Sequence, residues 1–380
     1  MPNRARSKEL GILKMGESVR VLFSWEFVGP HHLARVRSCA ELNGQIHARI
    51  FALADKSRIY NFYERGGADQ DVTIAYRSID AEDLSWWKRM KAYMRHVWGA
   101  SEDAYFLCHY ERLEVFLTAI VLRLRMKKVF VMGDSKFDDY QRRVFREAGK
   151  AIFYAPYNGA LVSGERCATY LRFLGVRGKI ETGYDTIDAK WVTQRRNQVS
   201  QNLCPQSFFI VINRLVKRKC TDLAIRAFAA FCRANEQKAR LVIVGEGPEE
   251  QGLRELAAGL GIADRVDFKG ALANEHVYSW LADAIALILA SNSEQWGLVV
   301  NEAVTCGVPV IVSDAVGARD TLVRNFVNGF VIENGNVEGL SRAMSTVARD
   351  RSRYVPPADV SFAAISERFA DAVSSLLGPK

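Results

Sequence analysis

The sequence of 380 residues lacks an apolar run long enough to cross a membrane. Its longest apolar stretch near the middle, Val115–Leu122, stops at Arg123, whereas a spanning helix needs about 20 apolar residues. Residues 1–18 carry four basic side chains but no apolar core of the kind that a secretory signal requires. We therefore expect a flexible N-terminal tail at 1–18, a cytoplasmic protein and no transmembrane helix.

Cysteine is present, but never as a Cys-x-x-Cys pair. The seven cysteines are Cys39, Cys108, Cys167, Cys204, Cys220, Cys232 and Cys306. An odd number of scattered cysteines is typical of reduced thiols and disfavours both a disulfide framework and a zinc site. We expect no metal site and no cofactor.

Acidic residues are fewer than basic residues mainly in the first half of the chain. Residues 1–190 hold 31 Lys and Arg against 23 Asp and Glu, whereas residues 191–380 hold 21 against 20. A basic half can attract nucleic acid, an anionic membrane or a phosphorylated ligand, and an ordinary solvated surface can carry the same charge. Charge alone does not distinguish these readings.

Short apolar runs alternate with longer segments of helical periodicity along the whole chain, which predicts an α/β fold of doubly wound parallel sheets. The strands expected in the first half are 19–24, 47–53, 104–109, 128–133, 151–154 and 179–183. Those expected in the second half are 208–213, 241–245, 266–270, 285–290, 308–313 and 329–332. The chain therefore holds two sheets in two domains.

A polar segment with Pro205 separates the two halves and reads as an interdomain linker. We expect an N-terminal domain at 19–192, the linker at 193–207 and a C-terminal domain at 208–358. A final helical segment at 359–380 could pack back on the N-terminal domain.

An anion site is expected where a helix begins at Gly297. Glycine lets another group approach the backbone closely, and the N–H groups of Leu298 and Val299 have no partner within the first turn of a helix. Such a helix start binds phosphate groups. A diphosphate would fit there.

Two carboxylates flank this helix start. Glu294 lies in the preceding loop and Glu302 within the helix, at the sheet edge where doubly wound folds bind ligands. One can bind sugar hydroxyls and the other a ribose. The alternative is a loop charge and a solvated helix residue.

Two cations follow the first strand of the second half, in the run NRLVKRK at 213–219. Arg214 and Lys219 both leave the carboxyl end of that strand and can offset the charge of a leaving diphosphate. Fixed cations of this kind would replace a metal ion in stabilising that charge. The alternative is a solvated basic turn.

The runs INRLVKRK, VIVGEGP, VDFKG and EQWGLVVNEA resemble, in the same order, the signature blocks of retaining family-4 glycosyltransferases. With CGVPVIVSDAVG and NGF they cover about residues 207–333. The resemblance implies the GT-B fold, two facing Rossmann-like domains with a cleft between them. It also implies transfer of a sugar, with retention, from a UDP- or GDP-linked donor to a hydroxyl of a glycan or lipid-linked acceptor in bacterial cell-surface polysaccharide assembly.

By this resemblance Glu294 contacts the donor sugar, Glu302 contacts the ribose, and Arg214 and Lys219 bind the diphosphate. Three departures stand out. The family usually has glycine where this chain has Asn213 and Cys220, and its Gly-Gly-x-x-Glu loop reads Gly317–Ala318–Arg319–Asp320 here. Asp320 could stand in for the missing glutamate.

The first half resembles the same family more weakly, through GPHHLARVRSCAEL at 29–42 and GYDTID at 183–188. Gly29 precedes a helix and is a candidate for close approach to the donor phosphate. His31 and His32 at the helix entrance, and His109 at the end of a strand, are candidates for acceptor contact. Helix capping, packing or a satisfied core histidine are the alternatives. We expect His109 to act in catalysis with Glu294, Arg214 and Lys219.

Residues 86–98 mix three tryptophans with four Lys and Arg. Amphipathic segments of this composition lie in membrane interfaces, with cations toward anionic lipid. An anionic membrane is therefore a candidate partner, at the inner face of the membrane. The alternative is a helix that packs its tryptophans into the first domain.

Other functions are less consistent with the chain. A nicotinamide dehydrogenase or sugar-nucleotide epimerase should have Gly-x-Gly-x-x-Gly after its first strand, where this chain has Gly29–Pro30–His31–His32. No helix-turn-helix, RNP-like or zinc motif accompanies the basic charge, so we expect no nucleic-acid partner. A non-catalytic nucleotide-sugar-binding protein of the same fold stays open.

Overall fold

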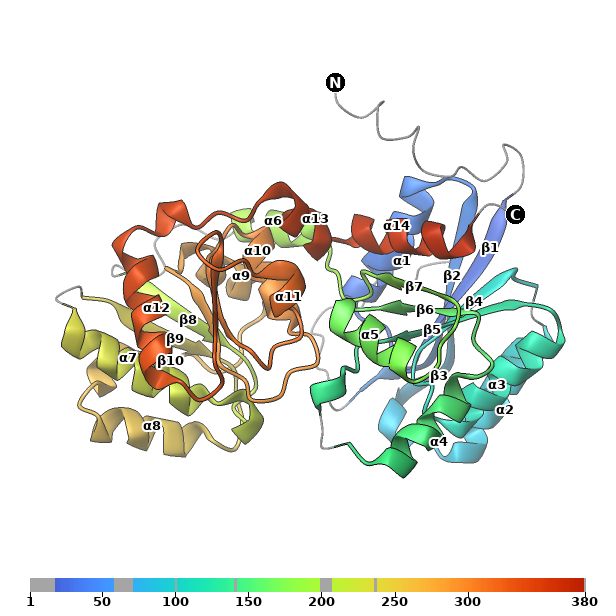
Figure 1. Ribbon diagram of the computed structural model, residues 1–380, viewed down its shortest axis with the longest axis horizontal. Helices are drawn as coiled ribbons and strands as arrows, with labels where there is room; N and C mark the ends of the chain where they lie inside the picture. Colours follow the sequence, from blue (N-terminus) through green and yellow to red (C-terminus); the bar gives the residue numbers. More distant parts are fainter. Residues whose placement is uncertain are drawn as a thin grey trace, which may run out of the picture.

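The computed structural model describes residues 18–57, 71–99, 101–139, 142–198, 207–235 and 238–378. These residues form two parallel sheets, each covered by helices, in two domains that lie beside each other (Figure 1). The expected fold of two doubly wound sheets is confirmed. The tail expected at 1–18 and much of the linker expected at 193–207 lie outside the described residues.

The N-terminal sheet has seven strands in the order β3-β2-β1-β4-β5-β6-β7. Its strands are β1 Val19–Trp25, β2 Ile46–Lys56, β3 Val72–Asp80, β4 Ala104–Leu107, β5 Lys128–Gly133, β6 Gly159–Val162 and β7 Lys179–Thr182. The strand order reverses between β1 and β4. Ligands of such sheets bind outside the carboxyl ends of the strands at this reversal.

Helices cover both faces of the N-terminal sheet. One face carries α1 Pro30–Leu42 and α14 Ser366–Leu377, and the other carries α2 Trp86–Trp98, α3 Leu113–Leu124, α4 Val144–Tyr154 and α5 Glu165–Phe173. Val21 and Phe23 of β1 point to the first core and Leu22 to the second. Strands buried on both faces read as continuous apolar runs, which is why they could be predicted.

The C-terminal sheet has six strands in the order β10-β9-β8-β11-β12-β13. They are β8 Phe208–Ile212, β9 Arg240–Val244, β10 Val266–Phe268, β11 Leu287–Leu289, β12 Val310–Ser313 and β13 Gly329–Ile332. One face carries α7 Thr221–Ala234, α8 Glu250–Gly259 and α12 Val337–Arg349. The other carries α6 Ala189–Gln198, α9 Asn274–Asp283, α10 Leu298–Thr305, α11 Arg319–Leu322 and α13 Ala358–Ala364.

Short 3-10 helices join several of these elements. They span Ala81–Asp83, Phe137–Asp139, Lys217–Lys219, Ala263–Arg265 and Arg351–Arg353.

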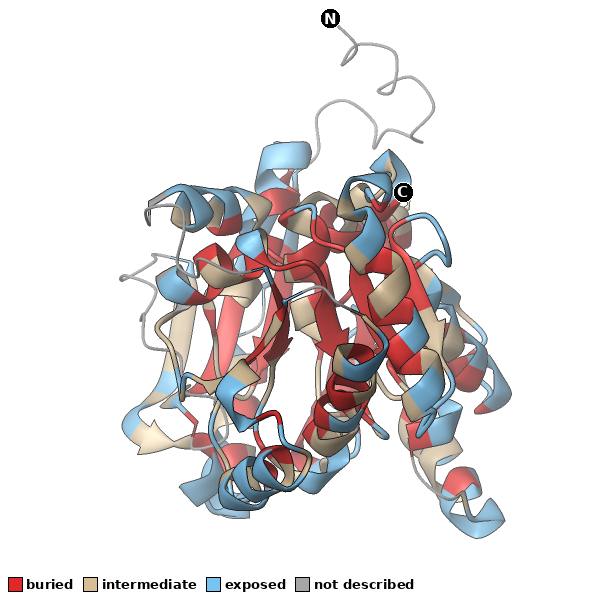
Figure 2. Ribbon diagram, turned by 90° about the vertical axis from the view of Figure 1, so that its left-hand side faces the viewer, coloured by how far each residue is buried: buried red, intermediate tan, exposed pale blue. Residues whose placement is uncertain are grey.

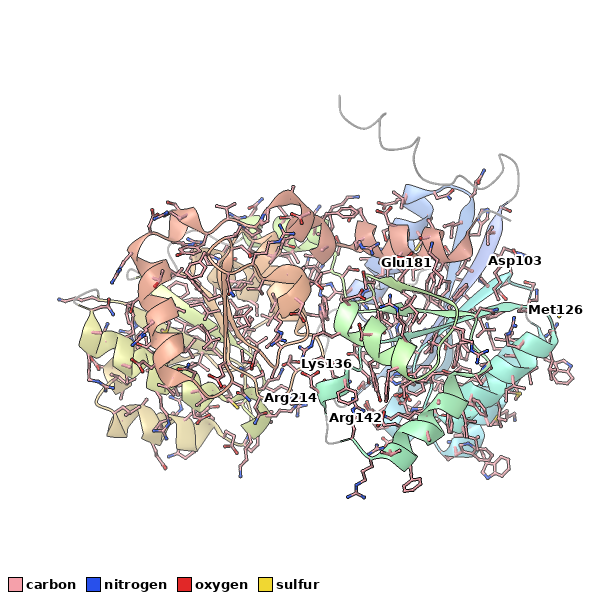
Figure 3. All side chains as sticks on the ribbon, viewed as in Figure 1. Asp103, Met126, Lys136, Arg142, Glu181 and Arg214 are labelled. Carbon is pink, nitrogen blue, oxygen red and sulfur yellow. The ribbon has the colours of Figure 1, made fainter. Side chains whose placement is uncertain are left out.

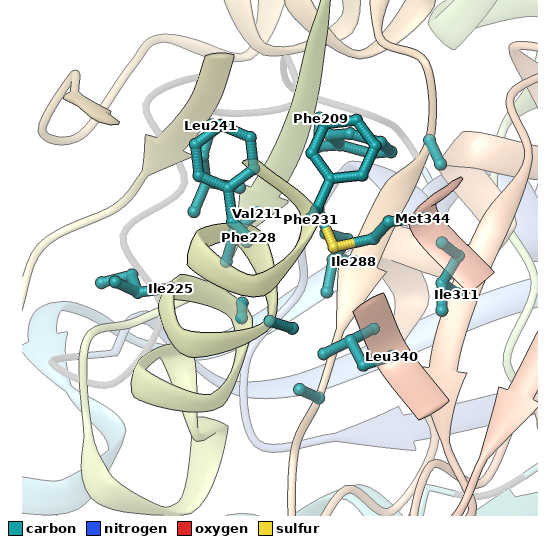
Figure 4. Close-up of a cluster of buried hydrophobic side chains, with 14 of the residues drawn as sticks. Phe209, Val211, Ile225, Phe228, Phe231, Leu241, Ile288, Ile311, Leu340 and Met344 are labelled. Carbon is teal, nitrogen blue, oxygen red and sulfur yellow. The ribbon is translucent and has the colours of Figure 1, made fainter. Parts of the chain in front are cut away.

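Aromatic side chains fill much of the core under α7. The rings of Phe209 and Phe231 lie 5.2 Å apart, and Met344 of α12 packs into the same cluster (Figure 4). Figure 2 shows buried residues concentrated in the strands and exposed residues on the outer sides of the helices. Each domain thus has its own core.

The chain passes between the domains twice, at adjacent places. The first crossing lies between β7 and α6, and α6 packs on α9 and α10 of the C-terminal domain. The second lies between α13 and α14, and α14 returns to pack on α1 of the N-terminal domain. Helix α6 runs to Gln198, so the linker expected from residue 193 begins within a helix. The segment expected as one final helix is divided between the domains.

One strand prediction in the N-terminal domain was wrong, and two strands were not predicted. Residues 151–154 end helix α4 instead of forming a strand, and β3 and β6 were missed. A short apolar run such as AIFY does not distinguish a strand from a buried helix turn. β3 lies at the sheet edge and has no buried residue, so it lacks an apolar pattern.

No helix within the described residues has the length and apolar character needed to span a membrane.

Candidate functional site

The carboxyl ends of the two sheets face each other across the domain boundary. Figure 3 shows Arg214 and Lys136 at this boundary, on opposite sides of it. Gln295 Nε2 lies 3.4 Å from Ser135 Oγ, and Arg166 Nε lies 3.6 Å from Asp320 Oδ2. Side chains from the two sheets therefore meet there, where ligands of doubly wound folds bind.

Lys219 and Glu294 form an ion pair at the carboxyl edge of the C-terminal sheet. Lys219 ends the 3-10 helix after β8, and its Nζ donates to the Glu294 carboxylate. The two side chains are only 13% and 12% exposed. Ser291 Oγ donates to the same carboxylate at 3.3 Å. Because the pair is largely withdrawn from water, each charge depends on the other.

Cys220 shows why glycine is usual after the lysine in the family that the chain resembles. Its φ and ψ are 48° and 44°, in the left-handed region that favours glycine. The same backbone turn is therefore kept here with a cysteine.

Gly297 starts helix α10 with φ 101°. A Cβ atom built there would lie 3.0 Å from Leu289 Cδ2 and 3.4 Å from Glu294 Cγ. Glycine is thus required both by the backbone conformation and by the packing. The N–H groups of Leu298 and Val299 belong to the first helical turn, as the sequence predicted, beside the Lys219–Glu294 pair.

Glu302 is reached from both domains. The Tyr278 hydroxyl of α9 donates to its Oε1 at 3.2 Å, and His31 Nε2 of α1 lies 3.8 Å from the same oxygen. Burial and the nearby Glu302 carboxylate raise the pKa of Tyr278, so its hydroxyl stays protonated and can donate. Glu302 is therefore not a simple solvated helix residue.

Arg214 is exposed and forms no ion pair with any residue in the described part of the chain. It follows β8 directly, at the same edge as Lys219. An unpaired guanidinium at this position is free to bind an oxyanion.

The two histidines at the start of α1 have different environments. His32 Nδ1 accepts a hydrogen bond from the Gly29 N–H at 3.0 Å, and its ring lies 4.7 Å from that of Trp25. Burial and the neighbouring Arg35 hold the pKa of His32 well below its usual value. His32 thus caps the helix and occupies the Gly29 N–H, whereas His31 reaches the domain boundary at Glu302.

His109 follows β4 with φ 61°, and about a third of its side chain is exposed. Glu111 lies 3.6 Å from its Nδ1 and Glu26 3.9 Å from its Nε2. Burial alone would lower the pKa of His109, but the Cys108 sulfur, Glu111 and Glu26 together raise it well above the usual value. His109 thus holds its proton more tightly than a free imidazole, at the reversal point of the N-terminal sheet.

Two carboxyl groups at the boundary were not predicted from the sequence. Burial, the Asp185 carboxylate and Asp139 raise the pKa of Asp134 to about 7. Burial also raises the pKa of Asp185 to about 6, against the effect of Arg35, whose Nη2 lies 3.4 Å away. Asp185 Oδ2 is buried without a hydrogen-bond partner. Single aspartates after strands gave no sequence signal, because only the fold brings them together.

A pocket of about 220 Å³ lies between the domains beside Asp134. It is lined by Asp134, Lys136, Ser163, Gly164, Glu165, Arg166 and Cys167 of the first domain and by Gln295, Trp296, Gly317, Asp320 and Thr321 of the second. The described residues contain no group of three or more His, Cys, Asp and Glu that could hold a metal ion.

A comparison with protein families shows which family the C-terminal domain resembles. The family described as "Glycosyl transferases group 1" matches residues 194–358. The C-terminal domain is thus similar in sequence to the group 1 glycosyl transferases. This confirms the resemblance to GT-B glycosyltransferases of the family-4 type that the signature blocks carried.

Relatives with named activities match a little over a third of the chain. The GDP-mannose-dependent alpha-(1-6)-phosphatidylinositol monomannoside mannosyltransferase of Mycobacterium tuberculosis is 35% identical over 153 residues, 38% of this chain and 39% of that protein. The D-inositol 3-phosphate glycosyltransferase of Streptomyces griseus is 35% identical over 154 residues, 38% of this chain and 32% of that protein. The match thus spans about a third or more of each relative's length.

Solved structures match nearly the whole chain. HepE of Anabaena, solved with UDP and glucose, superposes with a TM-score of 0.64 at 18% identity over 94% of this chain and 95% of that one. The lipopolysaccharide outer core galactosyltransferase WaaB gives a TM-score of 0.68 at 14% identity over 94% and 99%. These group 1 relatives and GT-B structures show that both domains share the GT-B fold.

The Asp134 carboxyl predicts a pH-dependent stability. The folded protein holds a proton on Asp134 between roughly pH 4 and 7 that the unfolded chain releases near 3.8, so stability falls as the pH rises through this window. Asp134→Asn removes this loss. A pKa difference of one corresponds to about 1.4 kcal/mol, so we expect a gain of at least ~1 kcal/mol over the wild type at pH 8 and little gain at pH 4.5.

Urea unfolding at pH 4.5, 6 and 8 measures this difference, with the exposed Asp264→Asn as a control. A difference between Asp134→Asn and wild type that does not change with pH would contradict the assignment.

Proposed function

We propose that the protein is a retaining glycosyltransferase that moves a sugar from a nucleotide-diphosphate sugar to a hydroxyl acceptor. The Lys219–Glu294 pair beside the start of α10 carries the proposal. It brings a cation, a carboxylate and free backbone N–H groups together at one sheet edge. Few ligands other than a phosphorylated sugar need all three.

The donor roles divide between charge and hydroxyl recognition. Arg214, Lys219 and the N–H groups of Leu298 and Val299 would bind the diphosphate. Glu294 would accept hydrogen bonds from the sugar and Glu302 from the ribose. Without donor, Lys219 and Glu294 satisfy each other, and a bound donor would offer a phosphate to the first and hydroxyls to the second.

The proposed transfer step uses these positions. The acceptor oxygen forms a bond to the anomeric carbon on the face from which the diphosphate leaves, the bond from that carbon to the diphosphate oxygen breaks, and the hydroxyl proton passes to the leaving phosphate. Arg214, Lys219 and the α10 N–H groups stabilise the negative charge that develops, in place of a metal ion. His109, whose pKa is raised, would add positive charge on the N-terminal side when it is protonated.

The names of the relatives suggest the substrates. The mycobacterial relative uses GDP-mannose and a phosphatidylinositol mannoside, and HepE was solved with UDP. We therefore propose a UDP- or GDP-linked hexose as donor. A glycan or lipid-linked intermediate of cell-surface polysaccharide assembly is the proposed acceptor.

A non-catalytic nucleotide-sugar-binding protein is the second candidate. It would keep the same donor ligands but would not release free nucleotide. Incubation of the protein with a panel of UDP- and GDP-sugars, with and without acceptor, separates the two candidates by nucleotide release.

The outer surface of α2 supports peripheral attachment to an anionic membrane at the inner face. Trp87 and Trp98 are 74% and 80% exposed, and Lys91 and Arg95 lie exposed between them on the same helical face. Phe145 of α4, on the same side of the sheet, is 93% exposed. Exposed aromatic rings with interspersed cations suit a headgroup interface.

Arg89 does not belong to this surface. It is buried, donates to the Leu84 carbonyl at 3.1 Å and pairs with Glu26. The tryptophans are therefore not packed into the domain, and Arg89 is not available to lipid.

We expect Glu294→Ala and Lys219→Ala each to reduce transfer at least ~100-fold, because each removes a charge that acts on the donor in the transition state. Each variant leaves the charge of the remaining partner unpaired in a largely buried place, so we expect a lower melting temperature, and rates are compared below the thermal transition of the variant. Initial rates and thermal unfolding are measured together. Glu338→Ala, which breaks an exposed ion pair on α12, is the matched control. Wild-type rates in either site variant would remove these residues from the mechanism.

We expect transfer to survive a strong chelator, because Arg214, Lys219 and the α10 N–H groups supply the positive charge. The measurement compares initial rates in EDTA with those after dialysis against MgCl₂ or MnCl₂. Loss of activity in EDTA that either metal restores would show that a metal ion takes part.

We expect replacement of Trp87, Lys91, Arg95 and Trp98 by serine to weaken binding to anionic vesicles at least ~10-fold, while UDP or GDP binding is unchanged. Juxtamembrane cations contribute about 1 kcal/mol each and are screened by salt, so raising the salt concentration weakens wild-type binding too. Vesicle co-sedimentation measures both effects. Absence of binding by the wild type would mean that the α2 surface serves another purpose.

A further inference from the structure

The two chain crossings between the domains are hydrogen-bonded to each other. Ile187 N donates to Ala364 O at 3.0 Å, and Ser366 N donates to Ile187 O at 2.9 Å. Helix α1 holds both crossings on the N-terminal side: Arg35 Nε donates to Thr186 O at 2.9 Å, and Ser38 Oγ donates to Ser366 O at 2.8 Å. Any movement of one domain against the other must bend the chain here.

One side chain of the C-terminal domain holds the same two crossings. Asn301 of α10 is completely buried, and its Nδ2 donates to Asp185 O at 2.9 Å and to Ala364 O at 3.0 Å. Both N–H groups of the amide are thus used, one on each crossing. Asn301 stands directly before Glu302 on the same helix.

The Asn301 amide oxygen is also occupied. It accepts a hydrogen bond from Trp296 Nε1 at 2.9 Å. Trp296 is buried and lies in the donor loop between Glu294 and Gly297. The loop that carries the proposed sugar ligand is therefore joined to both crossings through one amide.

The other end of the Trp296 ring rests on the N-terminal domain. A Cβ atom built on Gly164, before α5, would lie 2.9 Å from Trp296 Cζ3. The ring therefore sits directly on the glycine backbone across the domain boundary. Gly164 has extended φ and ψ, −157° and −177°, so its lack of a side chain serves this contact and not the backbone.

From these contacts we propose that Trp296 and Asn301 are positioning residues that couple the donor loop to the domain hinge, and this rests on the proposed function. Binding of a nucleoside diphosphate at the Glu294 loop favours the arrangement in which Trp296 seats on Gly164. Through Asn301 the same arrangement sets the angle of the two crossings. Neither residue is among the proposed donor ligands, and we propose that both act through Glu294 and Glu302.

The coupling predicts that a substitution lowers turnover but leaves nucleotide affinity nearly unchanged. Trp296→Phe removes the N–H that Asn301 accepts and also the outer ring atoms, Cζ3 and Cη2, that lie over Gly164. Because Arg214 and Lys219 are unchanged, we expect UDP or GDP affinity within about 2-fold of wild type and kcat reduced at least ~10-fold. We also expect the contraction of the radius of gyration on adding UDP or GDP, measured by small-angle X-ray scattering, to be lost.

Two further variants separate coupling from a folding defect. Asn301→Leu keeps the approximate size and adds no charge but loses both N–H donors to the crossings. Gly164→Ala acts from the other domain, with no backbone cost, by pushing the ring off its seat. We expect both variants to keep nearly the wild-type affinity for UDP or GDP and to have a reduced kcat. Trp280→Phe, a tryptophan packed on Phe208 away from the boundary, is the matched control and behaves as wild type.

Each outcome decides the proposal. It is overturned if Trp296→Phe and Gly164→Ala contract with UDP or GDP as the wild type does and keep its kcat, or if the wild type binds a nucleotide without contracting. Failure of the proposed function gives a different result, because the wild type then binds neither UDP nor GDP. If the wild type binds and contracts but transfers no sugar, the scattering measurement still tests the coupling.

Discussion

The backbone bridge between Ile187 and Ile365 sets the orientation of the two domains relative to each other. Parallel strands deliver every carboxyl end to one edge of a sheet, so each domain alone has a single reactive edge. Two crossings joined side by side, and held by Arg35 on one side and Asn301 on the other, turn these edges toward each other. The residues proposed to bind the donor and those facing the acceptor belong to different domains, so the site exists only through this pairing.

Charge at the boundary is balanced before any ligand arrives. Lys219 is paired with Glu294, Glu302 has Tyr278 and His31 beside it, and His109 lies between two carboxylates. A buried charge without a partner costs several kcal/mol, so an empty site needs such internal pairs. The proposed nucleotide-sugar donor would then replace one set of partners by another and need not strip water from bare charges. Arg214 is the exposed exception, suited to first contact with an incoming anion.

Features formed by residues close together in the sequence were predicted better than contacts between residues far apart in it. The strands buried on both faces and the Glu294–Glu302 segment could be identified because their residues are neighbours in the sequence. β3, with no buried residue, and β6, four residues long, carried too little pattern. Asn301 was missed because its partners lie 116 and 63 residues away. Its one local signal was a polar residue among apolar neighbours, five positions after a tryptophan.

Helix α14, near the end of the chain, packs into the core of the N-terminal domain. Phe369 is fully buried, with its ring 5.4 Å from that of Phe23 in β1. On the ribosome, β1 emerges more than three hundred residues before α14, although domains generally fold in the order of their synthesis. Until the whole C-terminal domain has been translated, helix α1 alone covers this face of the N-terminal sheet, and the part that α14 will cover stays open. The domain made first is therefore the one completed last.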